Sequence, residues 1–347
     1  MVITTILNAG KITERGGDSR GTIIRYSIIS LLIAFLGIVA GFLVFRFSVD
    51  QLSLNVEETS QVFRKMSGLI PSEFITPFME ANTPQLLTMA VVIGNALYLI
   101  GTQTEELNRI IRQLNMICLL LAEWVSRLVP FFVAILIIYD IWEGRIKWFT
   151  GTLWKCLLVS LTVSVLLMMT MICIVSIRNG ISSRLLIKKL WPSFILTLQT
   201  GSLNDSYGET VQCCVHKLGI DKGFTSLSLL HGLVLYMPVS VIGTMIMLLY
   251  AARLYQVTIT PLWLCTAAVL GVFLFVATPP VPGANLLAYI TIFAQLGIPQ
   301  NVLIAAMIYD VLFGLFASAA NQTMLELELI LQANRIGLLD REKLIQP

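Results

Sequence analysis

Long apolar segments separated by polar loops make up most of the chain. The hydrocarbon core of a bilayer is about 30 Å thick, and a helix needs about 20 apolar residues to cross it. The longest polar linker, 46–83, contains Pro71 and Pro77 and is followed by Pro84, so it is not expected to form one continuous helix. The pattern predicts full membrane spans at about 23–45, 84–101, 112–141, 152–177, 224–250 and 300–324.

Two further apolar segments, 186–217 and 260–297, are interrupted near their centres, at 201–208 and 278–283. Each interruption is flanked by apolar arms of about 15 residues, which as helices would cover only about 22 Å. We therefore predict two re-entrant helical hairpins that enter the membrane and turn back. Irregular backbone survives at membrane depth only where protein buries it or water reaches it, and paired broken segments indicate the binding site of a secondary transporter.

Composition supports a membrane protein and excludes several other classes. Apolar residues make up 56% of the chain and charged residues only 12%, with a mean hydropathy of +0.84. Soluble domains carry roughly 25% charged residues, so we predict an all-α multi-pass membrane protein. The sequence shows no metal-ligand spacing, nucleophile motif or phosphate loop, and it has no large basic patch. An enzyme and a nucleic-acid-binding protein are therefore not expected, and no cofactor is expected apart from a coupling ion.

The positions of lysine and arginine predict the orientation of the chain. With the N-terminus inside, most Lys and Arg residues fall in segments on the cytoplasmic side, as the positive-inside rule requires. Both termini are then cytoplasmic, the first hairpin enters from the cytoplasm and the second from outside. Hairpins that enter from opposite faces are typical of an inverted repeat in a protein of the cell membrane.

Short stretches distributed along the chain carry a resemblance to a known family. The most specific is Val-Pro-Gly-Ala at 281–284, followed by Leu-Gly-Ile-Pro at 296–299. The others are Ile-Pro at 70–71, Gly-Asn-Ala-Leu at 94–97, Leu-Gly-Ile at 218–220 and Asn-Gln-Thr at 321–323. In this order they resemble the dicarboxylate/amino acid:cation symporter family, the glutamate-transporter homologues.

The resemblance implies a fold of eight helices and two hairpins that assembles as a homotrimer. Compared with that fold, this chain would begin near the end of the second helix. It divides the chain into a stub that resembles the end of that helix, the third-helix equivalent with scaffold-like helices, a transport-like domain and a cytoplasmic tail. These parts are 1–22, 23–177, 178–334 and 335–347.

The resemblance also implies a binding site for a small polar solute between the two hairpin tips and the last helix. Asp310, Gly314, Ala317 and Asn321 follow helical spacing and would form one stripe of that helix. The predicted substrate-binding residues are Asn204, Asp205, Ser206, Pro282, Gly283, Ala284, Asp310 and Asn321.

Three positions of the last helix depart from the family pattern. Where the family's last helix carries an Asp for a substrate amine, an Arg for a substrate carboxylate and an Asp for sodium, this chain has Gly314, Ala317 and Leu325. Without the arginine there is no bidentate clamp, and a carboxylate would be desolvated without a partner. We therefore predict that glutamate, aspartate and C4-dicarboxylates are not substrates in the family manner.

Part of a sodium site is expected to survive. The resemblance implies Na⁺ ligands at Tyr26, Ser30, Gly232 and Asn321, although a threonine of this site is replaced by Ile29. The break in the family's seventh helix is replaced by a stretch containing Pro238, which lacks a backbone donor and is expected to kink its helix.

Two functions fit these features. The first is cation-coupled symport of a small polar or neutral solute, for example an amino acid, driven by Na⁺ or H⁺ through alternating access. The second is a non-transporting, truncated or degenerate family member with an interaction role or none. The lost charges favour the second function, and the retained hairpin pattern favours the first.

Overall fold

A computed structural model describes residues 3, 19–47, 71, 73–79, 82–142, 153–277 and 285–346. These residues are almost entirely helical and contain no strand, only an isolated bridge between Ile220 and Leu339. The helices are α2 (Ser19–Val44), α4 (Thr76–Met79), α5 (Thr83–Ile100), α6 (Glu105–Trp142), α8 (Trp154–Asn179), α9 (Ser183–Thr200), α10 (Tyr207–Gln212), α11 (Lys222–Leu235), α12 (Pro238–Leu254), α13 (Pro261–Ala277), α14 (Asn285–Leu296), α15 (Leu303–Ile336) and α16 (Arg341–Ile345).

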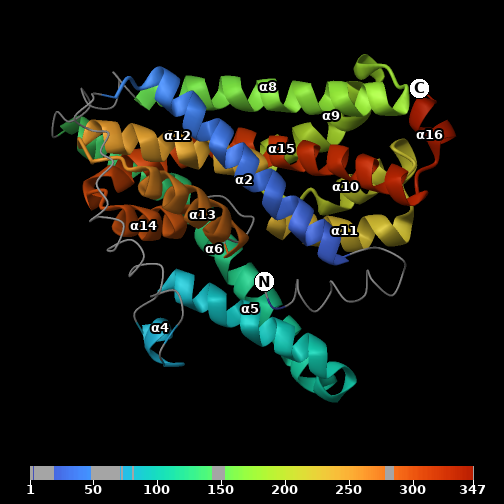
Figure 1. Ribbon diagram of the computed structural model, residues 1–347, viewed down its shortest axis with the longest axis horizontal. Helices are drawn as coiled ribbons and strands as arrows, with labels where there is room; N and C mark the ends of the chain where they lie inside the picture. Colours follow the sequence, from blue (N-terminus) through green and yellow to red (C-terminus); the bar gives the residue numbers. More distant parts are fainter. Residues whose placement is uncertain are drawn as a thin grey trace.

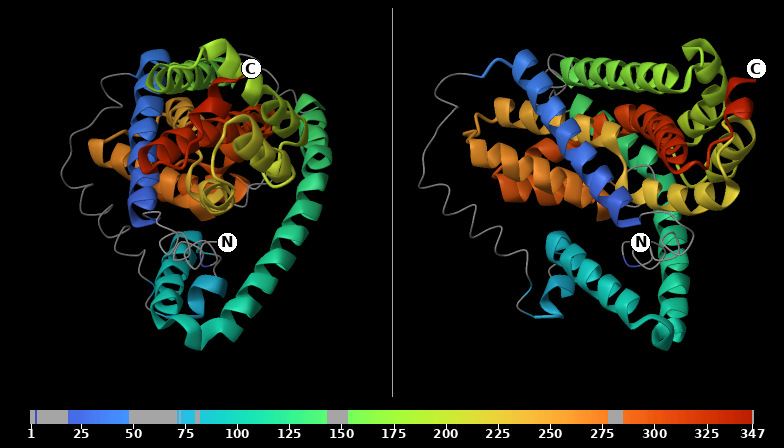
Figure 2. Two further views of the ribbon diagram at one scale, coloured as in Figure 1. Left: turned by 90° about the vertical axis from the view of Figure 1, so that its right-hand side faces the viewer. Right: turned by 45° about the vertical axis from the view of Figure 1, so that its right-hand side comes forward.

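Most helices pack into one bundle around α12 and α15 (Figure 1). Helix α2 crosses α12 diagonally, and α8 and α9 cover another side of α15. Helices α5 and α6 extend away from this bundle, and α6 forms a long arm along its side (Figure 2). The best-buried helices, α12 and the second half of α15, therefore form the centre of the molecule.

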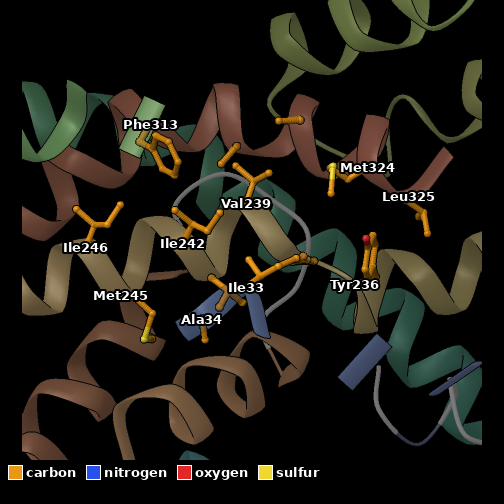
Figure 3. Close-up of a cluster of buried hydrophobic side chains, with 14 of the residues drawn as sticks. Ile33, Ala34, Tyr236, Val239, Ile242, Met245, Ile246, Phe313, Met324 and Leu325 are labelled. Carbon is orange, nitrogen blue, oxygen red and sulfur yellow. The ribbon is translucent and has the colours of Figure 1, made fainter. Parts of the chain in front are cut away.

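Two glycines allow α2 to approach α12 closely. A Cβ atom on Gly37 would lie 3.0 Å from Met245 Cβ and 3.2 Å from Ile242 Cα, and one on Gly41 would overlap Leu249. Small residues four positions apart let membrane helices pack backbone to backbone. Apolar side chains fill the layer beside this contact, with Ile33 and Ala34 from α2 near α12 (Figure 3).

Four helical stretches are long and apolar enough to cross a membrane, at Ile24–Val44, Trp154–Asn179, Lys222–Leu254 and Gln300–Ile336. They agree with four of the six predicted spans, and the prediction of an all-α membrane fold is confirmed. The predicted span at 84–101 is a shorter apolar helix, and the span at 112–141 lies within α6. The total number of crossings stays a prediction.

The first predicted break is where the chain leaves α9. The helix ends at Thr200 because Gly201 adopts a left-handed conformation, with φ of 65°, and its N–H bonds Thr197 O. The chain returns through α10 and a single π-helical turn, Cys213–Lys217. Cys213 Sγ lies 3.4 Å from Lys189 O, so the returning arm packs against α9.

The second interrupted segment forms the pair α13 and α14. Trp263 Nε1 donates a hydrogen bond to Leu296 O at 3.0 Å, which joins the start of α13 to the end of α14. The two helices therefore run side by side in opposite directions. The tip between them, including Pro282, Gly283 and Ala284, lies outside the described residues.

At Pro238, where a kinked helix was predicted, the structure has two separate helices. Helix α11 ends at Leu235, and α12 begins at Pro238 after a short non-helical step at Tyr236 and Met237. Proline is suited to the first turn of α12 because its missing N–H would have no partner there in any case.

Candidate functional site

Helix α15 carries polar side chains along its buried surface, which places it at the centre of any site inside the bundle. These side chains are at most 8% exposed, and they face different neighbours. They are Asp310, Asn321, Gln322, Thr323, Glu326, Glu328 and Gln332.

One set faces α9 and the loop after it. Gln322 Oε1 accepts hydrogen bonds from Thr197 Oγ1 at 2.5 Å and from Ser206 Oγ at 2.6 Å. One helical turn further, Glu326 Oε2 lies 3.1 Å from Ser193 Oγ. We refer to Ser193, Thr197, Ser206, Gln322 and Glu326 as the polar seam. It links α15 to the tip of the first helix pair through buried side chains.

A second set of polar atoms lies between α2, the α11–α12 break and α15. The oxygens of Tyr26, Ser30 and Tyr236 and Oε2 of Glu328 are buried and have no hydrogen-bond partner in the part of the chain that the structure describes. We refer to these four residues as the oxygen cluster. The Tyr26 and Tyr236 rings lie 4.9 Å apart, and the Glu328 carboxyl group interacts electrostatically with both tyrosines.

Glu328 also has a charged partner. Arg25 Nε lies 2.5 Å from Glu328 Oε1, and Gln332 Nε2 donates to the same oxygen at 3.0 Å. The carboxyl group is 1% exposed, whereas the arginine side chain is 30% exposed. The ion pair therefore neutralises a carboxylate that could not stay charged alone at this depth.

The predicted substrate residues on the first tip differ in exposure. Ser206 is buried and belongs to the polar seam, whereas Asn204 and Asp205 are exposed. Glu209, one turn after Asp205, pairs with Lys217 at 3.3 Å. Of these three predicted residues, one therefore faces the interior and two face the outside of the chain.

The predicted substrate residues on α15 already have partners. Asp310 Oδ1 accepts a hydrogen bond at 2.7 Å from Asn285, the first residue of α14. Asn321 Oδ1 accepts from Val239 N at 2.8 Å, and its Nδ2 donates to Ser240 Oγ at 2.7 Å. Asp310 therefore lies beside the second helix pair, whereas Asn321 caps the start of α12.

The predicted sodium ligands separate into two groups. Tyr26 and Ser30 lie one turn apart on α2 and both belong to the oxygen cluster. Gly232 faces Leu325, whose methyl groups would overlap a Cβ atom on that glycine. The amide of Asn321 makes the two hydrogen bonds described above. The geometry therefore groups Tyr26 with Tyr236 and Glu328, and Ser30 lies one turn further along α2.

Gln322, Glu326 and Glu328 are not among the site residues predicted from the sequence. A signal was present, because two glutamates alternate with leucines in the apolar stretch 324–330. A carboxylate inside a membrane helix is costly and marks a functional hypothesis by default. Only the packing of α15 reveals that the two glutamates face different partners.

Together, the apolar spans, the broken helices and the buried polar interior define a multi-pass helical membrane protein with features of a transporter. The sequence matches the model of the sodium:dicarboxylate symporter family over residues 1–325, and the chain belongs to this family. This confirms the resemblance found from its motifs, and the family is one of transporters.

The chain is also similar to "C4-dicarboxylate transport protein 2" of Ralstonia nicotianae (strain ATCC BAA-1114 / GMI1000), with 26% identity over 145 residues. The matched region is 38% of this chain and 32% of the relative, so it covers less than a third of the relative's length.

Proposed function

We propose that this protein is a secondary active transporter that couples the movement of a cation to that of a small polar or neutral solute. Amino acids are the first solutes to test. The family supports cation coupling, and it favours Na⁺ as the coupling ion. The polar seam supports a solute site inside the bundle, because it brings Ser206 of the first tip against Gln322 of α15.

The observation that carries the choice of solute is the absence of a basic side chain along the buried part of α15. Its one basic residue, Arg335, lies in the last turn. Ala317 is 2% exposed and offers no charge, and nothing on this helix could bind a carboxylate in bidentate fashion. A dianion would lose its hydration without compensation. We therefore propose a solute other than the C4-dicarboxylates named for the Ralstonia relative.

In this proposal 178–334 is the transport domain, and it moves as a body against the scaffold helices within 23–177. The two helix pairs are re-entrant hairpins whose tips alternately open the site. Asn204, Asp205 and Ser206 would form one gate, and Pro282, Gly283 and Ala284 the other. Both termini would face the cytoplasm, and the family resemblance favours a homotrimer.

The alternative is a family member that folds but does not transport. The placement of Leu325 against Gly232 favours it, because an apolar side chain fills space at a position where the family resemblance implies a sodium ligand. This alternative makes a different prediction for ligand binding, so one experiment separates the two.

That experiment is thermal unfolding of the purified protein in detergent with a panel of neutral amino acids, aspartate and succinate, in Na⁺ or in K⁺. A ligand that binds only the folded state stabilises it by about 2.7 kcal/mol when present at 100 times its Kd. We expect a neutral solute to raise the melting temperature in Na⁺ and the two dicarboxylates to leave it unchanged.

A rise with aspartate or succinate would contradict the proposed solute class. A well-folded sample that responds to no solute and no cation would support the non-transporting alternative.

We further propose that the coupling cation binds at the oxygen cluster. Buried oxygens without hydrogen bonds are places where an ion or an ordered water belongs, and hydroxyl and carboxylate oxygens suit a hard cation such as Na⁺. The cluster provides four such atoms, from Tyr26, Ser30, Tyr236 and Glu328.

The expected result for Ser30→Ala and Tyr26→Phe is a folded protein whose melting temperature no longer rises with Na⁺. Each substitution removes one oxygen and leaves the apolar contacts in place. The matched control is Ser164→Ala, because Ser164 on α8 is also buried without a hydrogen-bond partner among the described residues but is not part of the cluster. An undiminished sodium response in both cluster variants would place the cation elsewhere.

A further inference from the structure

One buried amide on α15 holds both arms of the first helix pair. Gln322 Oε1 accepts a hydrogen bond at 2.5 Å from Thr197 Oγ1 on α9, and another at 2.6 Å from Ser206 Oγ, the residue before α10. A carbonyl oxygen has two lone pairs, so it can serve both hydroxyl groups at once. The three side chains are at most 1% exposed. The outgoing and returning arms are therefore joined to α15 at a single oxygen.

The other contacts of these groups fix the direction of the hydrogen bonds. Gln322 Nε2 lies 3.4 Å from Ser193 O, a carbonyl that can only accept, so the amide oxygen is the atom that faces the two hydroxyl groups. Thr197 Oγ1 also lies 2.9 Å from Ser193 O, and Ser206 Oγ lies 3.2 Å from Ser202 O. Each hydroxyl group has one proton, and its contact to Gln322 is the shorter one.

The far end of the returning arm is anchored without Gln322. Lys189 on α9 donates to Lys217 O at 2.9 Å, where the π-helical turn ends. Asp340 N donates to Gly219 O at 2.8 Å, which ties the following residues to the C-terminal segment. Near the tip, in contrast, a Cβ atom on Gly208 would meet no neighbouring atom within 4 Å. The arm is thus fixed at its base, whereas there is space beside its tip.

We propose that Gln322 is the latch of the first tip, a positioning residue whose two hydrogen bonds keep this tip closed against α15. Opening separates Ser206 from Gln322, while the base of the arm stays attached to α9 and to the C-terminal segment. The inference rests on the proposed function, in which this tip is a gate, and it names the residue that controls the gate. Its test uses no solute. A latch found in a protein that binds no solute would contradict only the proposed function.

Alkylation of cysteines by N-ethylmaleimide, located by mass spectrometry, measures this movement in the purified protein. Leu203 lies in the tip and is 4% exposed, so Leu203→Cys provides a thiol that reacts only when the tip opens. The buried Cys213 and Cys214 begin the π-helical turn and report on the base of the arm. The buried Cys156 on α8 reports on unfolding of the whole protein.

Adding Gln322→Met to the Leu203→Cys protein is expected to make alkylation at position 203 about five-fold faster, the factor that corresponds to one net hydrogen bond. The rates at the base and at Cys156 should not change. The variant should fold, because both hydroxyl groups keep a backbone acceptor. Thr323→Val is the matched control, since the Thr323 hydroxyl bonds Ala319 O within α15 at 3.1 Å and should not affect the tip.

Ser206→Ala removes the bond between the tip and Gln322 from the other side, and it answers the question if Gln322→Met does not fold. The double variant should react no faster at position 203 than Gln322→Met alone, because both changes break the same bond. Unchanged alkylation at position 203 in both single variants would overturn the proposal. Additive effects, or an equal rise at Cys156, would also overturn it, because the two residues would then support the fold separately and not the closed tip.

Discussion

Arg25→Met is expected to lower the free energy of unfolding by about 3 kcal/mol, because it leaves the buried Glu328 carboxylate without its counter-charge. The methionine keeps most of the apolar stem, so the loss reflects charge rather than packing. Unfolding by sodium dodecyl sulfate in mixed micelles measures the change. If Na⁺ binds at the oxygen cluster, it should restore more stability to Arg25→Met than to the wild type.

The matched control is Arg184→Met, which removes an exposed arginine from α9 and should change stability by no more than about 0.5 kcal/mol. The double variant Arg25→Met, Glu328→Gln should recover much of the loss, since both charges are then absent. A single variant as stable as the wild type would show that solvent, rather than Arg25, compensates the charge of Glu328.

Lys189→Met is expected to cost about 3 kcal/mol and to release the C-terminal segment. The Lys189 ammonium group donates to Lys217 O at 2.9 Å and to Lys343 O and Leu344 O at 2.8 Å each. These carbonyls lie at or near the ends of the π-helical turn and of α16, where a cation is favourable. Without the ammonium group, these three carbonyl oxygens lose a hydrogen-bond donor. Each buried carbonyl then lowers the free energy of unfolding by part of its desolvation penalty.

Limited proteolysis measures this release, because cleavage near 337–346 should become faster in Lys189→Met than in the wild type. Lys188→Met is the matched control, since the neighbouring Lys188 is exposed. The backbone pairing of Gly219 and Asp221 with Asp340 and Leu338 also holds this segment. Unchanged cleavage in Lys189→Met would mean that this pairing is sufficient by itself.

The Arg25–Glu328 ion pair and the polar seam join α15 to two different helices. Glu328 is paired with Arg25 of α2, whereas Gln322 and Glu326 contact Thr197 and Ser193 of α9. The two sites lie on opposite sides of one rigid helix, so a change at either could be transmitted to the other through α15.

The sequence alone determined the class of the protein and several of its local features. Segment length and apolar content predicted a helical membrane fold, because the thickness of the bilayer sets the length of a span. Gly201 and Pro238 predicted where helices end, because their backbone chemistry acts within one turn of the chain. The order of short motifs predicted the family, which the family comparison confirmed.

Only the tertiary structure decided which polar residues meet. Glu326 and Glu328 are two positions apart on a helix with 3.6 residues per turn, so their side chains point about 200° apart. One therefore faces Ser193 on α9, and the other faces Arg25 on α2, about 300 positions earlier in the chain. The local pattern of leucine and glutamate is the same for both residues. Their different partners follow from the packing of distant helices, which the local pattern of the sequence does not reveal.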